Sequence, residues 1–397
     1  MKSDMAKQTG SSLNYGLFVM TVTHTLTHVF AQVHTALFPV LKDEFSLSLQ
    51  QLGLIAAIPP LCQVILSLPA GSLADRIGSR NMILISLSVA ALGSLIASQA
   101  LGPLMLIVAV SLVYSNTTMY HPAAYSFVTR FFKPRARLKA LGIHGAGGTF
   151  GVAIGPISLS ILMGLLAFGW RQAYLFWFFP IVLGIVAVLR IKSGPGDLPV
   201  DTIEEGDPPE ATTLLTANLA LFLTFIGIRT VARSMSDSFM ALYMVEDRAL
   251  SESASSFFIG SNALMGMIAA PLGGFLASRY GEKQWLLAVL ALSSTCFGLG
   301  FLVPNTAAFI ALYLAYGFFS FLGMAANSAI MAKLSPGRQR GLGYALFFLP
   351  GSIMAAVAPM IAATLAETFT LTSVFFASTA IFFVALGVLN FGVKVQP

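Results

Sequence analysis

Charged residues are scarce in this sequence. Among its 397 residues only 10% are Asp, Glu, Lys or Arg, 56% are hydrophobic, and the mean hydropathy is +0.83. Because soluble domains carry roughly 25% charged residues, this composition excludes an ordinary soluble protein and predicts an integral membrane protein. The hydrophobic residues form long runs suited to bilayer-crossing helices of about 20 residues, without the alternation of a membrane barrel.

Other absences narrow the function. No G-x-x-x-x-G-K-S/T loop occurs, so we expect no transport powered by ATP hydrolysis within this chain, and no cofactor. The stretch "HTLTH" at 24–28 lacks the glutamate of the H-E-x-x-H motif, which argues against an enzyme. Cys62 and Cys296 lie in distant apolar runs and are expected to be buried structural thiols. The polar start at 1–14 leads directly into the first run and predicts no cleavable signal peptide.

Twelve apolar runs predict an all-α membrane protein of twelve transmembrane helices, with both termini on one side of the membrane. The expected spans are 15–41, 50–74, 81–101, 103–127, 138–166, 170–190, 214–245, 253–277, 284–303, 306–332, 340–366 and 369–393.

Lysine and arginine predict the orientation. Of the 22, 17 lie at the two termini or in loops after even-numbered spans, whereas the opposite loops hold only Lys42, Arg171 and Arg248. The positive-inside rule therefore places both termini in the cytoplasm, with a bacterial inner membrane as the expected location. The net charge of +6 follows this topology and does not indicate nucleic-acid binding.

The chain divides into two similar halves. Residues 1–191 and 214–397 are joined by a Pro-, Gly- and acid-rich stretch at 192–213, which predicts a flexible cytoplasmic linker. After the second span stands "GSLADRIGSR" (71–80), and after the eighth "GFLASRYGEK" (274–283), at an offset of 203 residues. Pro156 and Pro359 share that offset, so we predict two six-helix halves repeated in parallel.

"GSLADRIGSR" resembles the signature loop of the major facilitator superfamily, and the resemblance extends over the whole chain. It implies the two-half transporter fold, a small-molecule substrate and an expected monomer in the lipid bilayer. The physical reading agrees, since the glycines permit tight turns and the charged residues can hold helix ends. The residues expected to control conformational exchange are Gly71, Asp75, Arg76, Gly78, Arg80 and Arg279.

Within the superfamily, three stretches resemble the fosmidomycin resistance protein family of exporters. They are "FPVLKDEFSLSLQQLGLI" (38–55), "YHPAAYSFVTRFF" (120–132) and "HGAGGTFGVAIGP" (144–156). Where relatives have a histidine followed by Asn-Asp, this chain has His24 and later "TH" at 27–28, and Ala123 stands where some relatives have glutamate. Proton coupling is therefore not carried over from the family.

Histidines form the first candidate site. On one helix the side chains of His24, His28 and Gln32 project at successive steps of 40° around one face, whereas His34 points away from them. His121 on the fourth span and His144 on the fifth lie at a depth similar to that of His24. Either of these two could instead hydrogen-bond a backbone carbonyl. Asn116, Tyr120 and, on the tenth span, Asn327 complete the expected substrate-binding groups.

Arginines form the second candidate site. Arg229, Arg233 and Asp237 follow an i, i+4, i+8 pattern on the seventh span, and Arg233–Ser234 resembles a pair in the fosmidomycin resistance family. Arg233 and Asp237 could form a structural ion pair. Two arginines against one acid leave a positive charge that is costly in a membrane, which favours an anionic substrate.

These patterns favour a proton-coupled secondary transporter that exports a small organic anion or drug-like compound. Arg229 and Arg233 would hold the anion, and His24, His28, His121 and Asp237 would exchange protons. The alternative is a transporter of a transition metal or metal chelate. In that case His24, His28, His121 and His144 would be ligands.

Overall fold

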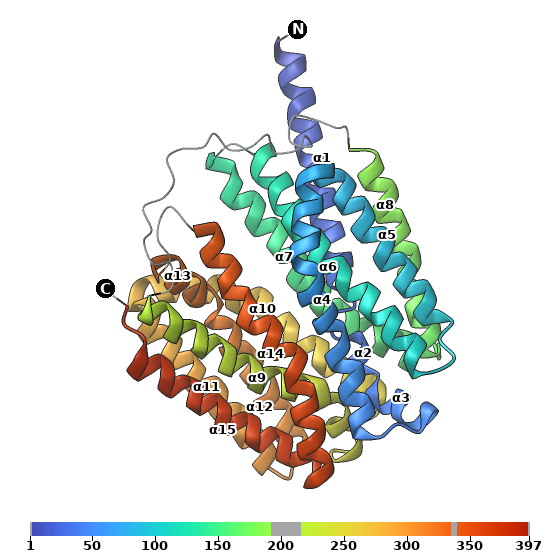
Figure 1. Cartoon of the computed structure of the whole chain (residues 1–397), viewed down its shortest axis with the longest axis vertical. Coiled ribbons are helices and arrows are strands. Elements are labelled where there is room, and N and C mark those ends of the chain that lie inside the picture. Colours follow the sequence, from blue (N-terminus) through green and yellow to red (C-terminus); the bar gives the residue numbers. More distant parts are fainter. Residues whose placement is uncertain (1, 133, 192–215, 335–339, 396–397) are drawn as a thin grey trace. The chain divides into compact units, whose positions relative to one another are not determined.

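The computed structural model describes residues 2–132, 134–191, 216–334 and 340–395, and this part of the chain is helical apart from short connections (Figure 1). The linker expected at 192–213 lies outside the described residues. The elements are α1 (Lys2–His28), α2 (Val33–Ala36), α3 (Phe38–Phe45), α4 (Leu49–Ile77), α5 (Ser79–Ser98), α6 (Pro103–Phe131), α7 (Pro134–Leu159), the π-helix η1 (Ser160–Leu165), α8 (Trp170–Leu189), α9 (Ala217–Glu246), α10 (Glu252–Tyr280), α11 (Glu282–Leu302), α12 (Thr306–Leu322), α13 (Met324–Leu334), α14 (Arg340–Thr368), α15 (Leu371–Gly387) and the π-helix η4 (Val388–Gly392).

The predicted all-α membrane fold is confirmed, with one difference in the first span. Within the described residues eleven helical segments are long and apolar enough to cross a membrane. The predicted span 15–41 is not one of them, because α1 ends at His28 and a turn precedes α2 and α3. In that turn the amide of Ala31 donates to the carbonyl of His28, three residues back, whereas an α-helix bonds four residues back. The 3.6-residue periodicity used in the prediction therefore stops at His28.

The chain forms two compact units. The first comprises Met1–His34 and Cys62–Gly206, and the second comprises Thr35–Leu61 and Asp207–Pro397. The segment Thr35–Leu61 includes α3, and it packs within the second unit. There Lys42 forms an ion pair with Glu246 at the end of α9.

Each unit contains the same pattern of helix packing. In the first unit α5 packs along α6 and α8, and α1 packs along α7. In the second unit α11 packs along α12 and α15, and α9 packs along α14. These are the third, fourth, sixth, first and fifth helices of each predicted half, so the packing repeats as the sequence does.

The repeat extends to single backbone conformations. Gly78, between α4 and α5, has a φ of 82°, and Gly281, between α10 and α11, has a φ of 87°. Ser46 and Ala249, which are also 203 residues apart, have φ angles of 50° and 54°. The two glycines of the signature loops thus make one-residue left-handed connections, which only glycine adopts without steric cost.

Glycines on α7 determine how closely α1 packs against it. A Cβ atom built on Gly147 would lie 2.5 Å from the carbonyl oxygen of Thr21, and one on Gly151 would lie 2.3 Å from that of Thr25. On Gly155 it would lie 1.9 Å from the carbonyl of Val29. The i, i+4 spacing therefore gives α7 a flat face on which the backbone of α1 rests.

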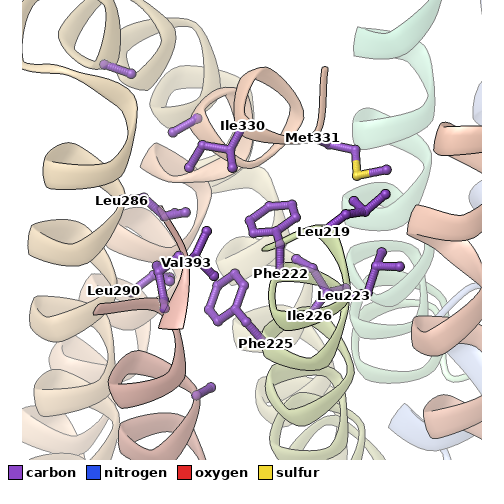
Figure 2. Packing of buried hydrophobic residues seen from close by; sticks show 14 residues of the cluster. Leu219, Phe222, Leu223, Phe225, Ile226, Leu286, Leu290, Ile330, Met331 and Val393 are labelled. Carbon is purple, nitrogen blue, oxygen red and sulfur yellow. The ribbon is translucent and has the colours of Figure 1, made fainter. Parts of the chain in front are cut away.

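The apolar core of the second unit lies around the start of α9. Figure 2 shows the rings of Phe222 and Phe225 among side chains from α11 and α13, including Leu286, Leu290 and Ile330. Phe222, Phe225, Leu286 and Ile330 have no exposed surface. This packing fixes the position of α9, the helix that carries the candidate arginines.

Candidate functional site

Three histidines meet in the first unit, as the sequence predicts for His24, His28 and His121. The Nε2 atom of His121, on α6, lies 3.2 Å from Nε2 of His24 and 3.0 Å from Nε2 of His28, both on α1. One ring nitrogen from each residue falls within 4.8 Å of the others. His24 is 4% exposed, and the other two are half-buried. We call these three residues the histidine trio.

The sequence positions the trio in two ways. The i, i+4 spacing places His24 and His28 on one face of α1, with ring centroids 4.9 Å apart. Across from them α7 leaves room, because a Cβ atom on Gly148 would lie 2.6 Å from Cε1 of His24. Gly148 therefore makes space for the His24 ring, a role that the sequence alone did not indicate.

His144 supports His24 from α7. Its ring stacks on that of His24 with centroids 4.1 Å apart, and its carbonyl oxygen lies 2.7 Å from His24 Nδ1. His144 Nδ1 lies 3.2 Å from the carbonyl of Met20, while its buried Nε2 has no hydrogen-bond partner among the described residues. The nitrogen atoms close enough to share one ion are those of His24, His28 and His121, and this group does not include His144.

The protonation of His24 follows from its partner. A carbonyl oxygen only accepts hydrogen bonds, so Nδ1 of His24 carries the hydrogen and donates it to His144. In the neutral ring Nε2 is then a bare lone pair, and it faces Nε2 of His121. This arrangement can hold a positively charged species, either a proton or a metal ion, between the rings.

Among the other residues expected near the histidines, Tyr120 stacks its ring on that of His24, with centroids 5.6 Å apart. Tyr120 is fully buried, and its hydroxyl donates to the carbonyl of Met20 at 2.8 Å. Asn116 is also fully buried, and within the described part of the chain neither polar atom of its side chain has a partner. Gln32 lies in the turn after α1, so helical phase does not place it beside His28. His34 lies on α2 with its ring against that of Tyr114, apart from the trio.

The second unit holds Arg229 in a small pocket between helices. Its Nη2 donates to Ser320 Oγ at 3.0 Å, and no carboxylate of the described residues lies within ion-pair distance of it. The pocket is roughly large enough for one water molecule and contains several hydroxyl groups. Its lining residues are Phe225, Arg229, Leu290, Ser293, Ser294, Tyr316, Ser320, Phe382 and Ala385.

Arg233 and Asp237 form the expected ion pair one turn further along α9. Arg233 Nε lies 3.2 Å from Asp237 Oδ2, and the two side chains are 45% and 32% exposed. The guanidinium of Arg233 also lies 6.0 Å from the ring centroid of Phe321. Since Asp237 is paired with Arg233, the unbalanced charge belongs to Arg229. Serine and tyrosine of α11 and α12 around Arg229 were not predicted, because single hydroxyl residues in apolar helices give no periodic signal.

The remaining predicted residues lie near helix ends. Asn327, on α13, is 7% exposed, and its Oδ1 has no partner in the residues that the structure describes. Arg80 donates from Nη2 to the carbonyl of Leu189 at 2.7 Å, and the guanidinium of Arg279 lies 5.7 Å from the ring centroid of Tyr280. Arg76 is exposed at the end of α4. Gly71 lies within α4, and the side chain of Asp75 lies outside the described part of the structure.

The sequence matches the Major Facilitator Superfamily over residues 20–228 and 217–397. The chain belongs to this superfamily. It is therefore a multi-pass membrane transporter and not an enzyme, as the sequence predicted.

Curated relatives are identical to the chain at about a quarter of the aligned positions. The hexuronate transporter of Bacillus subtilis is 24% identical over 310 residues, which cover 72% of this chain and 71% of that protein. The quinolone resistance protein NorB of Staphylococcus aureus is 25% identical over 185 residues, covering 47% and 38%. Among solved structures, a bacterial homologue of the human lysosomal transporter Spinster aligns with a TM-score of 0.82 and 16% identity over 95% of this chain and 96% of that one. The last similarity shows the fold.

Proposed function

We propose that this superfamily member is a proton-coupled secondary transporter that exports a small organic anion or drug-like compound. The observation that carries the proposal is Arg229, a half-buried guanidinium that has no carboxylate partner among the described residues. An unpaired cation inside a membrane is costly unless a ligand neutralises it. An anionic group of the substrate would supply that charge.

The relatives support an organic substrate. One is named a hexuronate transporter, and a hexuronate is a sugar carboxylate; another is named for quinolone resistance. The resemblance to the fosmidomycin resistance family supports export. The distribution of lysine and arginine supports a location of both termini in the cytoplasm of a bacterial cell. We further propose that the chain acts as a monomer.

The histidine trio supports proton coupling. Imidazole has an ordinary pKa of about 6.5, so it exchanges protons near neutrality. The titratable groups whose rings contact the trio are Tyr120, Tyr125 and His144, and none of them carries a negative charge near neutral pH. Protonation of the trio therefore adds a positive charge that none of these neighbouring groups balances. We propose that this charge favours the bound anion, so that anion affinity falls as pH rises and the proton is lost.

Binding of anions to the purified protein tests the proposal. A panel of sugar acids, phosphonates and quinolone carboxylates is titrated into the wild type and into Arg229→Gln. Loss of a hydrogen-bonded charge costs about 1.5–3 kcal/mol, so affinity should fall roughly 10- to 150-fold. Arg190→Gln is the matched control, because it removes an exposed arginine at the end of α8 and should leave affinity unchanged.

The result that contradicts the proposal is equal affinity in wild type and Arg229→Gln, with both proteins folded by circular dichroism. Anion affinity that does not change between pH 5.5 and 8 would contradict the proton coupling alone. Arg229→Lys separates charge from geometry. It keeps the charge but loses the fork of guanidinium donors, so we expect an intermediate affinity.

A further inference from the structure

Two nitrogen–nitrogen distances in the trio match those of a metal site, and all three ligand nitrogens lie within 4.8 Å of one another. In a tetrahedral zinc site with Zn–N bonds of about 2.0–2.1 Å, two ligand nitrogens lie about 3.3 Å apart. The Nε2 atom of His121 lies 3.2 Å from that of His24 and 3.0 Å from that of His28. We propose that the trio binds one divalent transition-metal ion of the zinc class through its three Nε2 atoms.

The surroundings of His24 hold its Nε2 in the orientation that coordination needs. Ligating histidines in metal sites almost always donate their other ring N–H to a carboxylate, a backbone carbonyl or water. His24 does so with the carbonyl of His144. Its Nε2 therefore presents a lone pair toward Nε2 of His121.

A single proton satisfies this arrangement incompletely. One proton on Nε2 of His121 can be shared with Nε2 of His24 or with Nε2 of His28, but not with both at once. The other close pair of nitrogens then has no hydrogen from His121 between them. One metal ion accepts a lone pair from all three nitrogens at once. The metal also uses the same lone pairs as the proton, so the two exclude each other.

The ligand chemistry selects the class of ion. No carboxylate of the described residues joins the three imidazole nitrogens in this group. Such a set of ligands suits zinc, nickel, copper or cobalt, whereas magnesium and calcium require oxygen ligands. Three protein ligands leave a fourth position for water or for an anionic group. The proposal rests on the geometry of the trio and does not depend on the proposed anion transport.

Metal binding to the full-length purified chain tests this inference. The protein is prepared in detergent with a histidine-free affinity tag, and Zn²⁺ is titrated by calorimetry. We expect one ion per chain, with affinity reduced at least tenfold in each of His24→Ala, His28→Ala and His121→Ala, as expected when a ligand is lost. His34→Ala is the matched control, because it removes another buried membrane histidine outside the trio and should bind like the wild type. Mg²⁺ should not bind.

Two further variants separate metal binding from folding and from anion transport. Gly148→Ala places a Cβ atom 2.6 Å from the His24 ring, so it should displace that ring and weaken Zn²⁺ binding while all three histidines remain. Arg229→Gln should bind Zn²⁺ normally, even if it loses the anion. X-ray absorption at the zinc edge should show nitrogen or oxygen ligands with imidazole scattering and no sulfur.

Three results would overturn the inference. They are the absence of Zn²⁺ binding to the wild type, unchanged binding when His24 or His121 is replaced, and sulfur in the zinc coordination shell. Each variant is first shown to be folded by its melting temperature and elution volume. If the alanine variants do not fold, His24→Gln and Gly148→Ala provide the same comparison.

Discussion

Replacing Gly155 by alanine places a methyl group against the backbone of the turn that follows α1. The new Cβ atom would lie 1.9 Å from the carbonyl oxygen of Val29, whereas real Cβ atoms essentially never come closer than 3.0 Å. α7 and this turn must therefore separate locally by at least about 1.1 Å. The amide of Val29 donates to the carbonyl of Thr25, which ties the turn to α1, and overpacking of this kind costs about 1–3 kcal/mol. The better helix propensity of alanine offsets only about 0.5–1 kcal/mol of that cost.

Gly145→Ala is the matched control on the same helix, because no atom of the described residues lies within 4 Å of the Cβ atom that it adds. It should be as stable as the wild type or slightly more stable. The measurement is the thermal unfolding midpoint of each purified variant in one detergent. We expect Gly155→Ala to melt several degrees below Gly145→Ala, since a difference of about 2 kcal/mol shifts the midpoint by that amount. Equal midpoints would refute the claim that α7 packs directly on the backbone of α1.

Three more predictions concern the second unit. Gly281→Ala puts a Cβ atom on a residue with a φ of 87°, which should cost about 1–2 kcal/mol in unfolding free energy, and an unchanged denaturation midpoint would contradict this. Asp237→Asn should lower the unfolding free energy by less than about 1 kcal/mol, because the ion pair with Arg233 is partly exposed. The same change should strengthen anion binding, since it frees Arg233 from its partner. Weaker anion binding in titrations would disprove a role of Arg233 in holding the anion. The side chains of Lys42 and Glu246 are 30% and 38% exposed, so a double-mutant cycle should give a coupling free energy below about 1 kcal/mol. A larger value would show that this ion pair contributes more to stability than its exposure implies.

The residues with strong periodic or compositional signals were predictable from sequence. Long apolar runs fix the helices, and the 203-residue offset fixes the repeat. His24 and His28 could be placed together because i, i+4 residues share a helix face, and His121 followed from its depth along α6. These inferences need only local geometry and chain direction.

Contacts that depend on tertiary packing were not predictable in the same way. The end of α1 at His28 moved Gln32 off the expected face, since periodicity assumes that the helix continues. The hydrogen bond between Arg229 and Ser320 joins two helices, and nothing in the sequence pattern around either residue indicates the other as its partner. Gly148 could be read only as part of a glycine-rich packing face, whereas its contact with the His24 ring depends on how α1 and α7 meet.

The two halves share a scaffold and differ in their ionisable groups. The offset of 203 residues pairs the turn glycines with each other, and it preserves the helix packing within each unit. It pairs His24 with Gly227 and Arg229 with Leu26. If these polar residues served the fold, the repeat would be expected to keep them in both halves, as it keeps the glycines. The histidines lie in the first half alone, and the arginine of this site lies in the second. This division suits a transporter in which the first half binds a cation and the second binds an anion.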